Sequence, residues 1–465
     1  MERPYGRLAF IFFILATFLR LLLYWVNSPD NAFDNHFMPI FLMIKDNTIP
    51  AKDACFQCYQ PPVFYLISAI VGKIAVIMGA NVDQIKKLLQ FLPCFYGIIT
   101  LVPIYLILKE VPLSDFSRLF AFGTICFLPR HIYMSAMNSN DTLSYLMVAL
   151  CIYLLLIAIE RNFSLKSLLT LSIAITITLF AKYTAFALIP VVMIVFAGAL
   201  FKLPLANKRR SAALFFLTLF IPLSCLGFYA SRNMKNYRNP LPWNLSMIDP
   251  SESQPRDEGG VSYFSFKPWE TIQSPILMPG ELHSFWTIVY SGVWFDNEPK
   301  FLYFTDANIS WWEDYYAWLR GEGDFPGDNP SRSRLAMSVG SGVIALGLFP
   351  LFLTILGVLS YLKTYLTALP SSNGYAGKIK MSVFPVLFIC NAAGIIAVTL
   401  RLPVYSAMKA SYFLISMPAF AVFIALGIMA LENWIVLKMA VSVVLGALFA
   451  LVSFHILHIL SFFMV

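Results

Sequence analysis

The chain has 465 residues, of which 59% are hydrophobic and only 12% are charged, and its mean hydropathy is +0.72. Soluble globular domains carry about 45–50% apolar and roughly 25% charged residues, so water is excluded as the solvent of most of this surface. The net charge of +8 comes from Lys and Arg in short clusters between apolar runs, which excludes the continuous basic stripe of a nucleic-acid-binding protein. Seven cysteines without zinc-ribbon spacing exclude a disulfide scaffold. This composition predicts an all-α polytopic membrane protein.

The first apolar run, residues 8–26, follows Arg3 and Arg7 and precedes Asp30 and Asp34. Its length of about 19 residues is enough to cross roughly 30 Å of hydrocarbon. No small-residue cleavage motif follows it, so we expect a membrane anchor rather than a signal peptide. Because basic residues remain on the cytoplasmic side, the amino terminus is predicted to be cytoplasmic and the segment after residue 26 to lie outside.

Further apolar runs follow along the chain at 61–80, 88–108, 116–134, 141–160, 166–181, 184–202, 211–230, 336–362, 381–399, 411–432 and 435–463. Between 231 and 335 the hydropathy collapses, and unsatisfied backbone is not tolerated in lipid, so this stretch is predicted to be a large folded outer loop. The expected organisation is a transmembrane module over 1–230 with a first outer loop at 27–87, a loop region over 231–335, and carboxy-terminal membrane helices over 336–465.

The run at 61–80 is expected to lie on the membrane surface. If it crossed together with the two runs after it, Asp34 and Asp141 would face opposite sides. If it stays at the interface, the Lys and Arg clusters of all the later inner loops become cytoplasmic. Lys73 also interrupts the run, which suits an interfacial helix better than a span. The topology is therefore about eleven spans plus interfacial helices in the first outer loop.

This topology gathers the remaining unusual polar residues at the outer face. Ionisable groups at such positions are functional candidates by default, because burying them unpaired costs several kcal/mol. They are residues 34–36, 55–60, 130–131, 138–141, 182–183 and 232–233, the loop 231–335, Arg401 and Lys409.

Several of these segments resemble motifs of one family in order along the chain. Asp34-Asn35-His36-Phe37 and then Cys58-Tyr59-Gln60-Pro61-Pro62-Val63-Phe64-Tyr65 resemble the first-loop acidic motif and the following PPLYY-like motif of polyprenyl-phosphate-dependent glycosyltransferases with the GT-C fold. The segment 129–141, ending in Asn138-Ser139-Asn140-Asp141, is similar to their second acidic motif. Three further segments resemble later motifs of the same family. They are Ala181-Lys182-Tyr183-Thr184, Ser231-Arg232-Asn233 running to Tyr237 and Pro240, and Lys409-Ala410-Ser411-Tyr412 running to Pro418.

The resemblance, which extends from about residue 8 to about 430, implies a GT-C-like fold and a function. The family includes the protein O-mannosyltransferase and lipid A aminoarabinose transferase-like superfamily. It implies a hexosyl- or pentosyltransferase, usually inverting, that uses a polyprenyl (dolichyl or undecaprenyl) monophosphate sugar. The acceptor would be a protein, lipid or glycan on the periplasmic or lumenal face of a bacterial plasma membrane or endoplasmic reticulum membrane. Membrane lipid is the other expected partner, and nucleic acid is not.

Glycosyl transfer needs a carboxylate that accepts the proton of the acceptor hydroxyl while C1 of the sugar is attacked, and Asp34 is the predicted base. Asp141 is the second catalytic acid. It binds a divalent cation, Mg²⁺ or Mn²⁺, together with Asp34, or it orients the acceptor. The alternative for each residue is an ordinary helix N-cap, since Asp34 and Asp141 both precede predicted helices.

Charge builds on the lipid phosphate as the sugar leaves, so cations aimed at it stabilise the transition state. Lys409 and Arg232 are the leading candidates for this phosphate-binding role, followed by Lys182 and Arg401. The alternative is that these side chains snorkel from helix ends to the interface, as Lys and Arg commonly do. Arg20, inside the first run, either snorkels or lines the site.

The resembling motifs also supply the expected acceptor- or substrate-binding residues, which are His36, Tyr59, Gln60, Asn138 and Tyr412. Cys55 and Cys58 have metal-ligand or redox spacing, and with no second pair nearby a structural disulfide is favoured over zinc. The aromatic cluster at 311–316 is interpreted as a headgroup-level anchor, with sugar stacking as the alternative.

Two other classes of protein remain as alternatives. A transporter or channel requires charges across the bilayer midplane or a broken-helix repeat, whereas here the charges gather at one side. A non-catalytic membrane scaffold or receptor would leave the acidic and basic residues scattered. Convergence of these residues around one site therefore discriminates between the enzyme and its alternatives.

Overall fold

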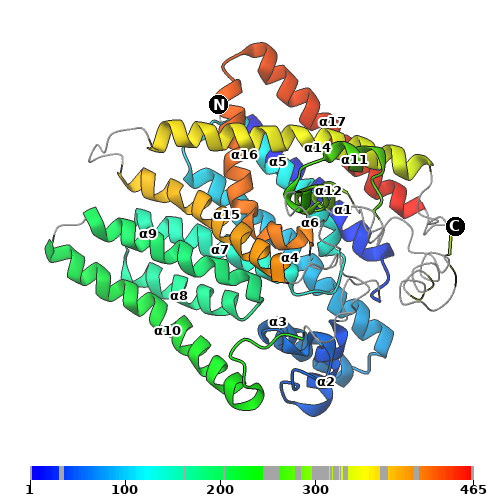
Figure 1. Ribbon diagram of the computed structural model, residues 1–465, viewed down its shortest axis with the longest axis vertical. Coiled ribbons are helices and arrows are strands. Elements are labelled where there is room, and N and C mark those ends of the chain that lie inside the picture. The colour runs from blue at the N-terminus through cyan, green and yellow to red at the C-terminus, as the bar shows by residue number, and fades with distance from the viewer. Residues whose placement is uncertain are drawn as a thin grey trace.

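The computed structural model describes residues 3–30, 36–161, 163–202, 205–244, 262–277, 284–295, 334–366, 375–401 and 408–461, with a few single positions between 314 and 327. The regular elements in these ranges are helices. Figure 1 shows α8, α9, α10, α14 and α15 running in roughly the same orientation, with α2 and α3 together below them.

Eight candidate spans in the described part of the chain are long and apolar enough to cross a membrane. Their helices are α1 (Arg3–Val26), α4 (Val82–Glu110), α7 (Asp141–Glu160), α10 (Leu205–Tyr237), α14 (Arg334–Tyr361), α15 (Tyr375–Arg401), the 3-10 helix η9 (Ala410–Ser416) continuing into α16 (Met417–Leu431), and α17 (Ile435–Ser461). Two shorter apolar helices, α8 (Leu165–Leu179) and α9 (Leu188–Lys202), accompany them. The protein is thus a multi-pass membrane protein, while the count of about eleven spans stays a prediction.

The segment between α1 and α4 stays on one side of the helix bundle. It contains α2 (Phe37–Asp46), the 3-10 helix η1 (Phe56–Tyr59) and α3 (Val63–Ile77), a helix of 15 residues that is not among the candidate spans. At the start of α4, the Lys87 ammonium donates to the carbonyl oxygens of Tyr24 and Asn27 at the end of α1, at 2.6 and 2.8 Å. Helix α4 therefore begins at the face where α1 ends, as the prediction of an interfacial helix over 61–80 requires.

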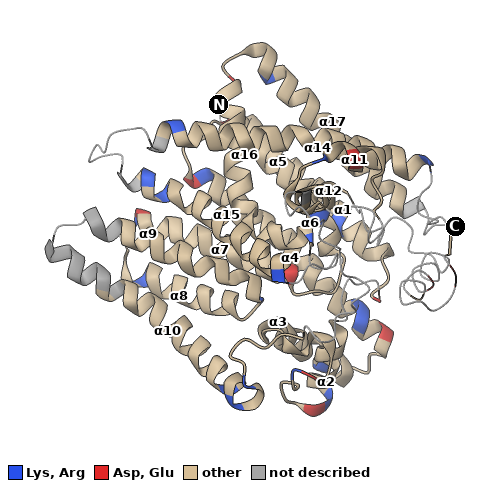
Figure 2. Cartoon of the chain, viewed as in Figure 1, with Lys and Arg blue, Asp and Glu red and all other residues tan. Residues whose placement is uncertain are grey.

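The opposite ends of several helices meet at the other face. Lys380, near the start of α15, lies 3.3 Å from Glu110 at the end of α4 and 3.7 Å from Glu160 at the end of α7. Figure 2 shows Lys and Arg at the left-hand ends of α8, α14 and α15, while the bodies of these helices carry few charges. The position of these basic residues at the helix ends agrees with the predicted inner loops that join the helices. Which face is cytoplasmic stays a prediction.

Two predicted runs differ from the observed helices. The run 116–134 was expected to be continuous, but it forms α5 (Asp115–Cys126) and α6 (Pro129–Ser135). Proline lacks an N–H and clashes with the preceding turn, so Pro129 ends one helix and starts another as its first residue. Helix α10 extends to Tyr237, beyond the predicted end at 230. The predicted division of the chain at 230 and 335 stays a prediction.

Helices α14 and α16 are in backbone contact through a reciprocal pair of glycines. A Cβ atom added at Gly357 would overlap the carbonyl oxygen of Phe423, and one added at Gly427 would overlap the carbonyl oxygen of Leu353. Small residues allow membrane helices to approach in this way, since their association depends on close van der Waals packing. Residues of these two helices also line the apolar cavity described below.

Gly357→Ala is expected to destabilise the protein, because inserting atoms into packed contacts costs about 1–3 kcal/mol. The measurement is the apparent melting temperature of the purified protein in detergent. Gly394→Ala in α15 is the matched control, since a Cβ added there has no atom within 4 Å. Equal melting temperatures for the two variants would contradict the tight contact between α14 and α16.

Candidate active site

A buried ion pair lies at the start of α7. Asp141 is the first residue of this helix, and Lys182 lies in the extended connection between α8 and the 3-10 helix η2 (Tyr183–Ala187). The Lys182 ammonium is 2.6 Å from Asp141 Oδ1, and each side chain is only 8% exposed. Asn140 occupies the N-cap position, which corrects the alternative that Asp141 is itself the cap. The helix begins one residue earlier than that alternative requires.

Aromatic and hydroxyl groups surround this pair. Ser139 donates to Asp141 Oδ2 at 3.2 Å, and the Lys182 ammonium lies 5.3 Å from the centre of the Tyr412 ring in η9. The Tyr145 hydroxyl lies 3.3 Å from Asp141 Oδ1 and 2.7 Å from the carbonyl oxygen of Ser411. Its single proton serves one of these acceptors at a time, and the shorter distance favours Ser411.

The loop before α3 joins the same site. The backbone N–H of Val63 donates to the carbonyl oxygen of Phe180 at 3.0 Å, which holds the start of α3 against the segment that carries Lys182. Tyr183 stacks on Tyr59 with 6.4 Å between ring centres and donates to its carbonyl oxygen at 3.2 Å. Gln60 donates to the Tyr59 hydroxyl at 2.9 Å. These contacts bring together four of the motifs described in the sequence, at 58–65, 129–141, 181–184 and 409–418.

The predicted base lies outside the described residues. Asp34 and Asn35 are in the range 31–35, and the structure places only the next residue, His36. Nδ1 of His36 is 2.8 Å from the hydroxyl of Tyr65 in α3, and the ring is buried. This bond fixes His36 beside the loop that carries Tyr59 and Gln60. Its predicted role in acceptor binding stays a prediction.

The predicted phosphate-binding residues have different environments. Lys182 is engaged by Asp141. Lys409 is half-buried at the N-cap of η9, next to the residues that face Asp141. Arg232 is half-buried near the end of α10 and contacts Asn233 Oδ1 at 3.5 Å, whereas Arg401 is exposed at the end of α15. Lys409 thus lies in the chain two and three residues before Ser411 and Tyr412, which contact Tyr145 and Lys182.

Arg20 does not snorkel. It is fully buried in α1 and donates to the carbonyl oxygens of Ala16 and Cys126, at 2.8 and 3.0 Å. A third contact, at 2.8 Å, joins its guanidinium to Nδ1 of His131 in α6. Because a guanidinium only donates hydrogen bonds, Nδ1 of His131 must be unprotonated, so this imidazole is neutral. The His131 ring lies against Tyr145, with 5.9 Å between ring centres, at the edge of the site.

The sequence analysis included Ser139 only as a member of the motif 138–141, and it did not single out Tyr145. A usable signal existed for Tyr145, because residues four apart share one face of a helix and Tyr145 follows Asp141 by that spacing. No local signal identified the Arg20–His131 contact, which joins residues 111 positions apart.

Cys55 and Cys58 form a disulfide, as the sequence favoured over zinc. The side-chain amide of Asn244, after α10, donates to the carbonyl oxygens of Lys52, Cys55 and Phe56 at 2.7–3.2 Å. The disulfide-bonded loop is thereby tied to the chain that follows α10. The predicted aromatic anchor at 311–316 falls outside the described residues except for Asp314.

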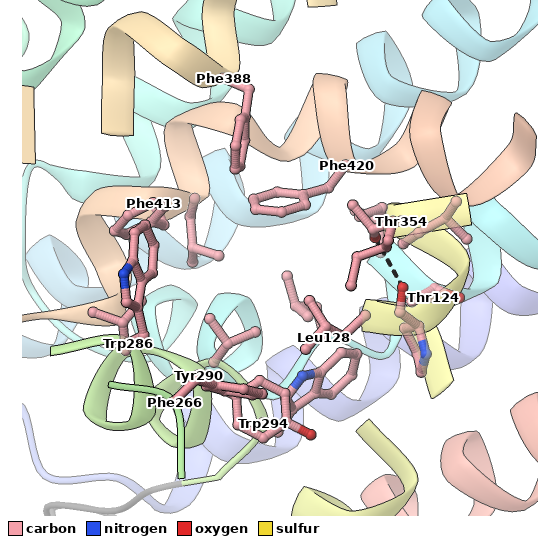
Figure 3. A pocket seen from close by; sticks show the side chains of 18 residues that line it. Thr124, Leu128, Phe266, Trp286, Tyr290, Trp294, Thr354, Phe388, Phe413 and Phe420 are labelled. Atoms are coloured by element: carbon pink, nitrogen blue, oxygen red, sulfur yellow. Dashed lines mark hydrogen bonds between the residues drawn. The ribbon is translucent and has the colours of Figure 1, made fainter. Parts of the chain in front are cut away.

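An apolar cavity of about 410 Å³ lies on the other side of η9. Its walls come from α5, α12 (Phe285–Trp294), α14, α15, η9 and α16, and Figure 3 shows aromatic side chains including Trp286, Phe388 and Phe413 around its open centre. Its hydroxyl groups are already engaged: Thr354 donates to the Pro350 carbonyl at 2.8 Å and Tyr290 to the Ile344 carbonyl at 2.6 Å. The cavity therefore suits a hydrocarbon chain.

The helix η9 is the shared wall of the two sites. The carbonyl oxygen of Ser411 accepts from Tyr145 and the Tyr412 ring faces Lys182, whereas the next two residues, Phe413 and Leu414, line the apolar cavity. The backbone of η9 is fixed by Asn391 of α15, whose amide donates to the Tyr412 carbonyl at 3.1 Å and to Ser416 Oγ at 2.9 Å. A charged site and an apolar cavity are thus one helix apart.

The described residues alone do not form a metal site. They contain no group of three or more His, Cys, Asp or Glu side chains arranged to hold an ion. Asp141 already contacts an ammonium, and a hard cation needs more oxygen ligands than this one carboxylate supplies. The predicted site of Asp34 and Asp141 is only half placed, so no catalytic step is assigned to a metal.

Comparison with solved structures identifies the fold. The chain is similar to the archaeal oligosaccharyltransferase of Archaeoglobus fulgidus tethered to an acceptor peptide with an NVT sequon, at 14% identity and a TM-score of 0.51 over 97% of this chain and 55% of that one. It is also similar to AglB of the same organism in complex with an inhibitory peptide and a dolichol-phosphate, at 14% identity and a TM-score of 0.50 over 99% and 55% of the two chains. This likeness shows a GT-C membrane fold, as the motifs predicted.

The match covers only part of each of these oligosaccharyltransferase chains. The chain spans about half the length of these oligosaccharyltransferases. ArnT from Cupriavidus metallidurans matches at 13% identity over 89% of this chain and 76% of ArnT, but its TM-score of 0.36 is too low to support an argument. No protein-family model matches the sequence, and neither does any curated protein sequence.

Proposed function

We propose that this protein transfers a sugar from a polyprenyl monophosphate donor to an acceptor on the outer face of the membrane. The observation that carries the proposal is the placement of a buried charged cluster and an apolar cavity on the two sides of η9. A lipid-linked sugar has one charged end and one hydrocarbon chain, and these two neighbouring sites match its two ends. The isoprenoid chain is the proposed occupant of the cavity in Figure 3.

The proposed reaction is a direct displacement at C1 of the sugar. The acceptor hydroxyl oxygen attacks C1 as the bond from C1 to the phosphate oxygen breaks, and the electron pair of that bond stays on the phosphate. The hydroxyl proton passes to the Asp34 carboxylate, and a positioned base of this kind contributes about 10²–10⁴-fold. One displacement inverts the configuration at C1.

The acceptor is a protein, lipid or glycan, and acceptor or donor-substrate binding is assigned to His36, Tyr59, Gln60, Asn138 and Tyr412. A. fulgidus AglB, which shares this fold, is seen with a dolichol-phosphate and a peptide, and this supports a dolichyl or undecaprenyl donor here. The proposed membrane is the bacterial plasma membrane or the endoplasmic reticulum membrane, with the site on its extracytoplasmic side. A transporter is disfavoured because Asp141, Lys182 and Tyr412 converge at the ends of helices.

Sugar transfer is tested with purified protein in lipid nanodiscs. A panel of decaprenyl-, undecaprenyl- and dolichyl-phosphate sugars, both hexoses and pentoses, is incubated with the protein, and released or transferred sugar is measured. One donor or a few related donors are expected to be consumed. A protein that consumes none of them, and is not stabilised against heat by any of them, is not a transferase of this class.

A divalent cation at Asp34 and Asp141 is a separate part of the proposal. The assay is repeated in EDTA, and then with Mg²⁺ or Mn²⁺ restored. Loss and recovery of turnover would support a cation shared by the two carboxylates. Unchanged turnover would leave Lys182 as the cation that the described residues place on Asp141 and remove the metal from the proposal.

Lys409→Ala is expected to lower turnover without unfolding the protein, because removing a group that stabilises a developing anion costs about 2.7–4 kcal/mol of transition-state stabilisation. Lys409→Arg keeps the charge but changes the geometry of its donors, so partial activity is expected. Lys267→Ala is the control, since Lys267 pairs at 3.3 Å with Glu270 in an exposed position. Full turnover in Lys409→Ala would contradict phosphate binding by Lys409.

A further inference from the structure

The segment 131–142, which runs from α6 across its connection to the first turn of α7, contains buried polar atoms that have no hydrogen-bond partner among the described residues. They are both amide atoms of Asn138, Oδ1 of Asn140, Oγ1 of Thr142 and Nε2 of His131. All four side chains are fully buried. Unpaired buried groups carry a free-energy penalty and are few in native structures, so a cluster of them within twelve residues of chain requires an explanation.

The segment that carries these atoms also carries Ser139 and Asp141 of the candidate active site. Asn140 occupies the N-cap position of α7 but makes no capping hydrogen bond with its side chain, and its Nδ2 instead donates at 3.2 Å to the carbonyl oxygen of Ala181, the residue before Lys182. Because the nitrogen must face that carbonyl, the unpartnered atom of this amide is its oxygen. The atoms are shielded from bulk water, so a bound molecule must supply their hydrogen-bond partners.

The contact with Arg20 determines whether Nε2 of His131 donates or accepts a hydrogen bond. A guanidinium only donates hydrogen bonds, so Nδ1 of His131, at 2.8 Å, must accept. In a neutral imidazole the proton then resides on Nε2, which makes the unpartnered nitrogen a donor. The described atoms without partners therefore include donors, at His131 Nε2 and Asn138 Nδ2, and acceptors, at Asn138 Oδ1 and Asn140 Oδ1.

This mixture selects one ligand chemistry. An ionised phosphate only accepts hydrogen bonds and would leave the two amide oxygens unpaired. A metal ion would satisfy those oxygens but would repel the two N–H donors. Hydroxyl groups both donate and accept, so they can satisfy every atom of the set.

We propose that His131, Asn138, Asn140 and Thr142 form a subsite that binds the hydroxyl groups of the donor sugar, and that Arg20 is a positioning residue that keeps His131 a donor. The inference rests on the proposed function and deepens it by separating sugar recognition, at the α6–α7 connection, from phosphate recognition at the basic residues. A buried water molecule offers the same chemistry, and the experiment distinguishes the two.

The test compares two lipids by their effect on thermal stability, since a ligand that binds the folded state raises the melting temperature. Decaprenyl phosphate without sugar and the decaprenyl-phosphate sugar consumed in the panel are each added to wild-type protein and to Asn138→Leu. We expect Asn138→Leu to respond to the bare lipid as the wild type does. Its affinity for the sugar-bearing lipid, relative to the bare lipid, should fall by about tenfold or more. Its melting temperature without lipid should be unchanged or higher.

The other outcomes contradict the inference. A lower melting temperature without lipid would show that Asn138 has a structural partner or a permanent water, and a retained preference for the sugar-bearing lipid would remove Asn138 from the subsite. Ser172→Ala is the control, because Ser172 Oγ is also buried and without a partner among the described residues but lies within α8. If neither lipid stabilises the wild type, the proposed function fails and this inference fails with it.

A second measurement tests Arg20 and His131 independently of turnover. The chain has five histidines, so selective ¹⁵N labelling gives a simple solid-state NMR spectrum, and the difference from His131→Gln assigns His131. Nδ1 is expected to be unprotonated in the wild type, and this signature should be lost in Arg20→Met and kept in Arg20→Lys. His131→Gln, whose amide nitrogen reaches the Nε2 position, should bind the sugar-bearing lipid better than His131→Asn. A protonated Nδ1 in the wild type, or equal binding by these two variants, would overturn the role of Arg20.

Discussion

Lys182→Met is expected to destabilise the protein by about 3–5 kcal/mol, because it removes one partner of a buried ion pair and leaves the other charge uncompensated. Both side chains of the pair are 8% exposed, and their charged atoms are 2.6 Å apart. Neither the Tyr145 hydroxyl nor Ser139 carries a charge that would replace the ammonium. The measurement is the free energy of unfolding in mixed detergent micelles, or the apparent melting temperature where unfolding is irreversible.

Two further variants show whether the loss comes from the unpaired charge. The double variant Asp141→Asn, Lys182→Met removes both charges together, so it is expected to be clearly more stable than Lys182→Met alone. Lys86→Met is the control, since Lys86 pairs with Asp30, which is 61% exposed, and a surface pair contributes only about 0–1 kcal/mol. Equal losses for Lys86→Met and Lys182→Met would contradict a strong buried pair.

Much of the fold follows from the sequence because the bilayer imposes a simple rule on it. Apolar runs of sufficient length mark the long helices, such as α4 and α7, and the distribution of Lys and Arg orders their ends. The argument that 61–80 cannot cross is supported by one contact, between Lys87 and the end of α1. The break at Pro129 was missed because the average hydropathy of 116–134 does not register a helix end inside an apolar run.

The candidate site was predictable in part for a different reason. Resemblance to a known motif order singled out Asp141, Lys182 and Tyr412, and the structure brings these residues into contact. Partners that depend on tertiary packing were not visible, such as the carbonyl of Ser411, which is 266 positions from Tyr145. No local pattern distinguishes a snorkelling arginine from Arg20, because the distinction depends on which carbonyl oxygens lie beside it.

The same packing explains how a charged site can exist beside lipid. The connections that precede α7 and η2 and the short helix η9 meet at the ends of long apolar helices, where irregular backbone is covered by protein. The backbone carbonyl of Ala181 accepts from Asn140 in the neighbouring connection, and that of Ser411 accepts from Tyr145 in α7. The long helices therefore provide the rigid frame, and the interruptions between them provide the chemistry.

Asp34→Asn is expected to reduce turnover by about 10²-fold or more, because asparagine keeps the volume of the side chain and much of its hydrogen bonding but cannot accept the proton of the acceptor hydroxyl. A 100-fold loss corresponds to about 2.7 kcal/mol of transition-state stabilisation. The measurement is kcat for the donor identified in the panel. Since the substitution leaves the basic residues and the apolar cavity in place, decaprenyl phosphate should still raise the melting temperature of this variant as it does that of the wild type.

Asp30→Asn is the matched control for Asp34→Asn, because Asp30 lies in the same loop but pairs with Lys86 at 2.6 Å in an exposed position. Its kcat should remain close to that of the wild type, since a surface pair carries little energy and takes no part in proton transfer. The two variants differ from the wild type by the same loss of one carboxylate, so a general change in surface charge would affect both equally. Equal kcat in Asp34→Asn and the wild type would remove the base from Asp34 and move the search to another group at this face. A fall in kcat together with loss of the lipid-induced stabilisation would instead assign Asp34 to donor binding.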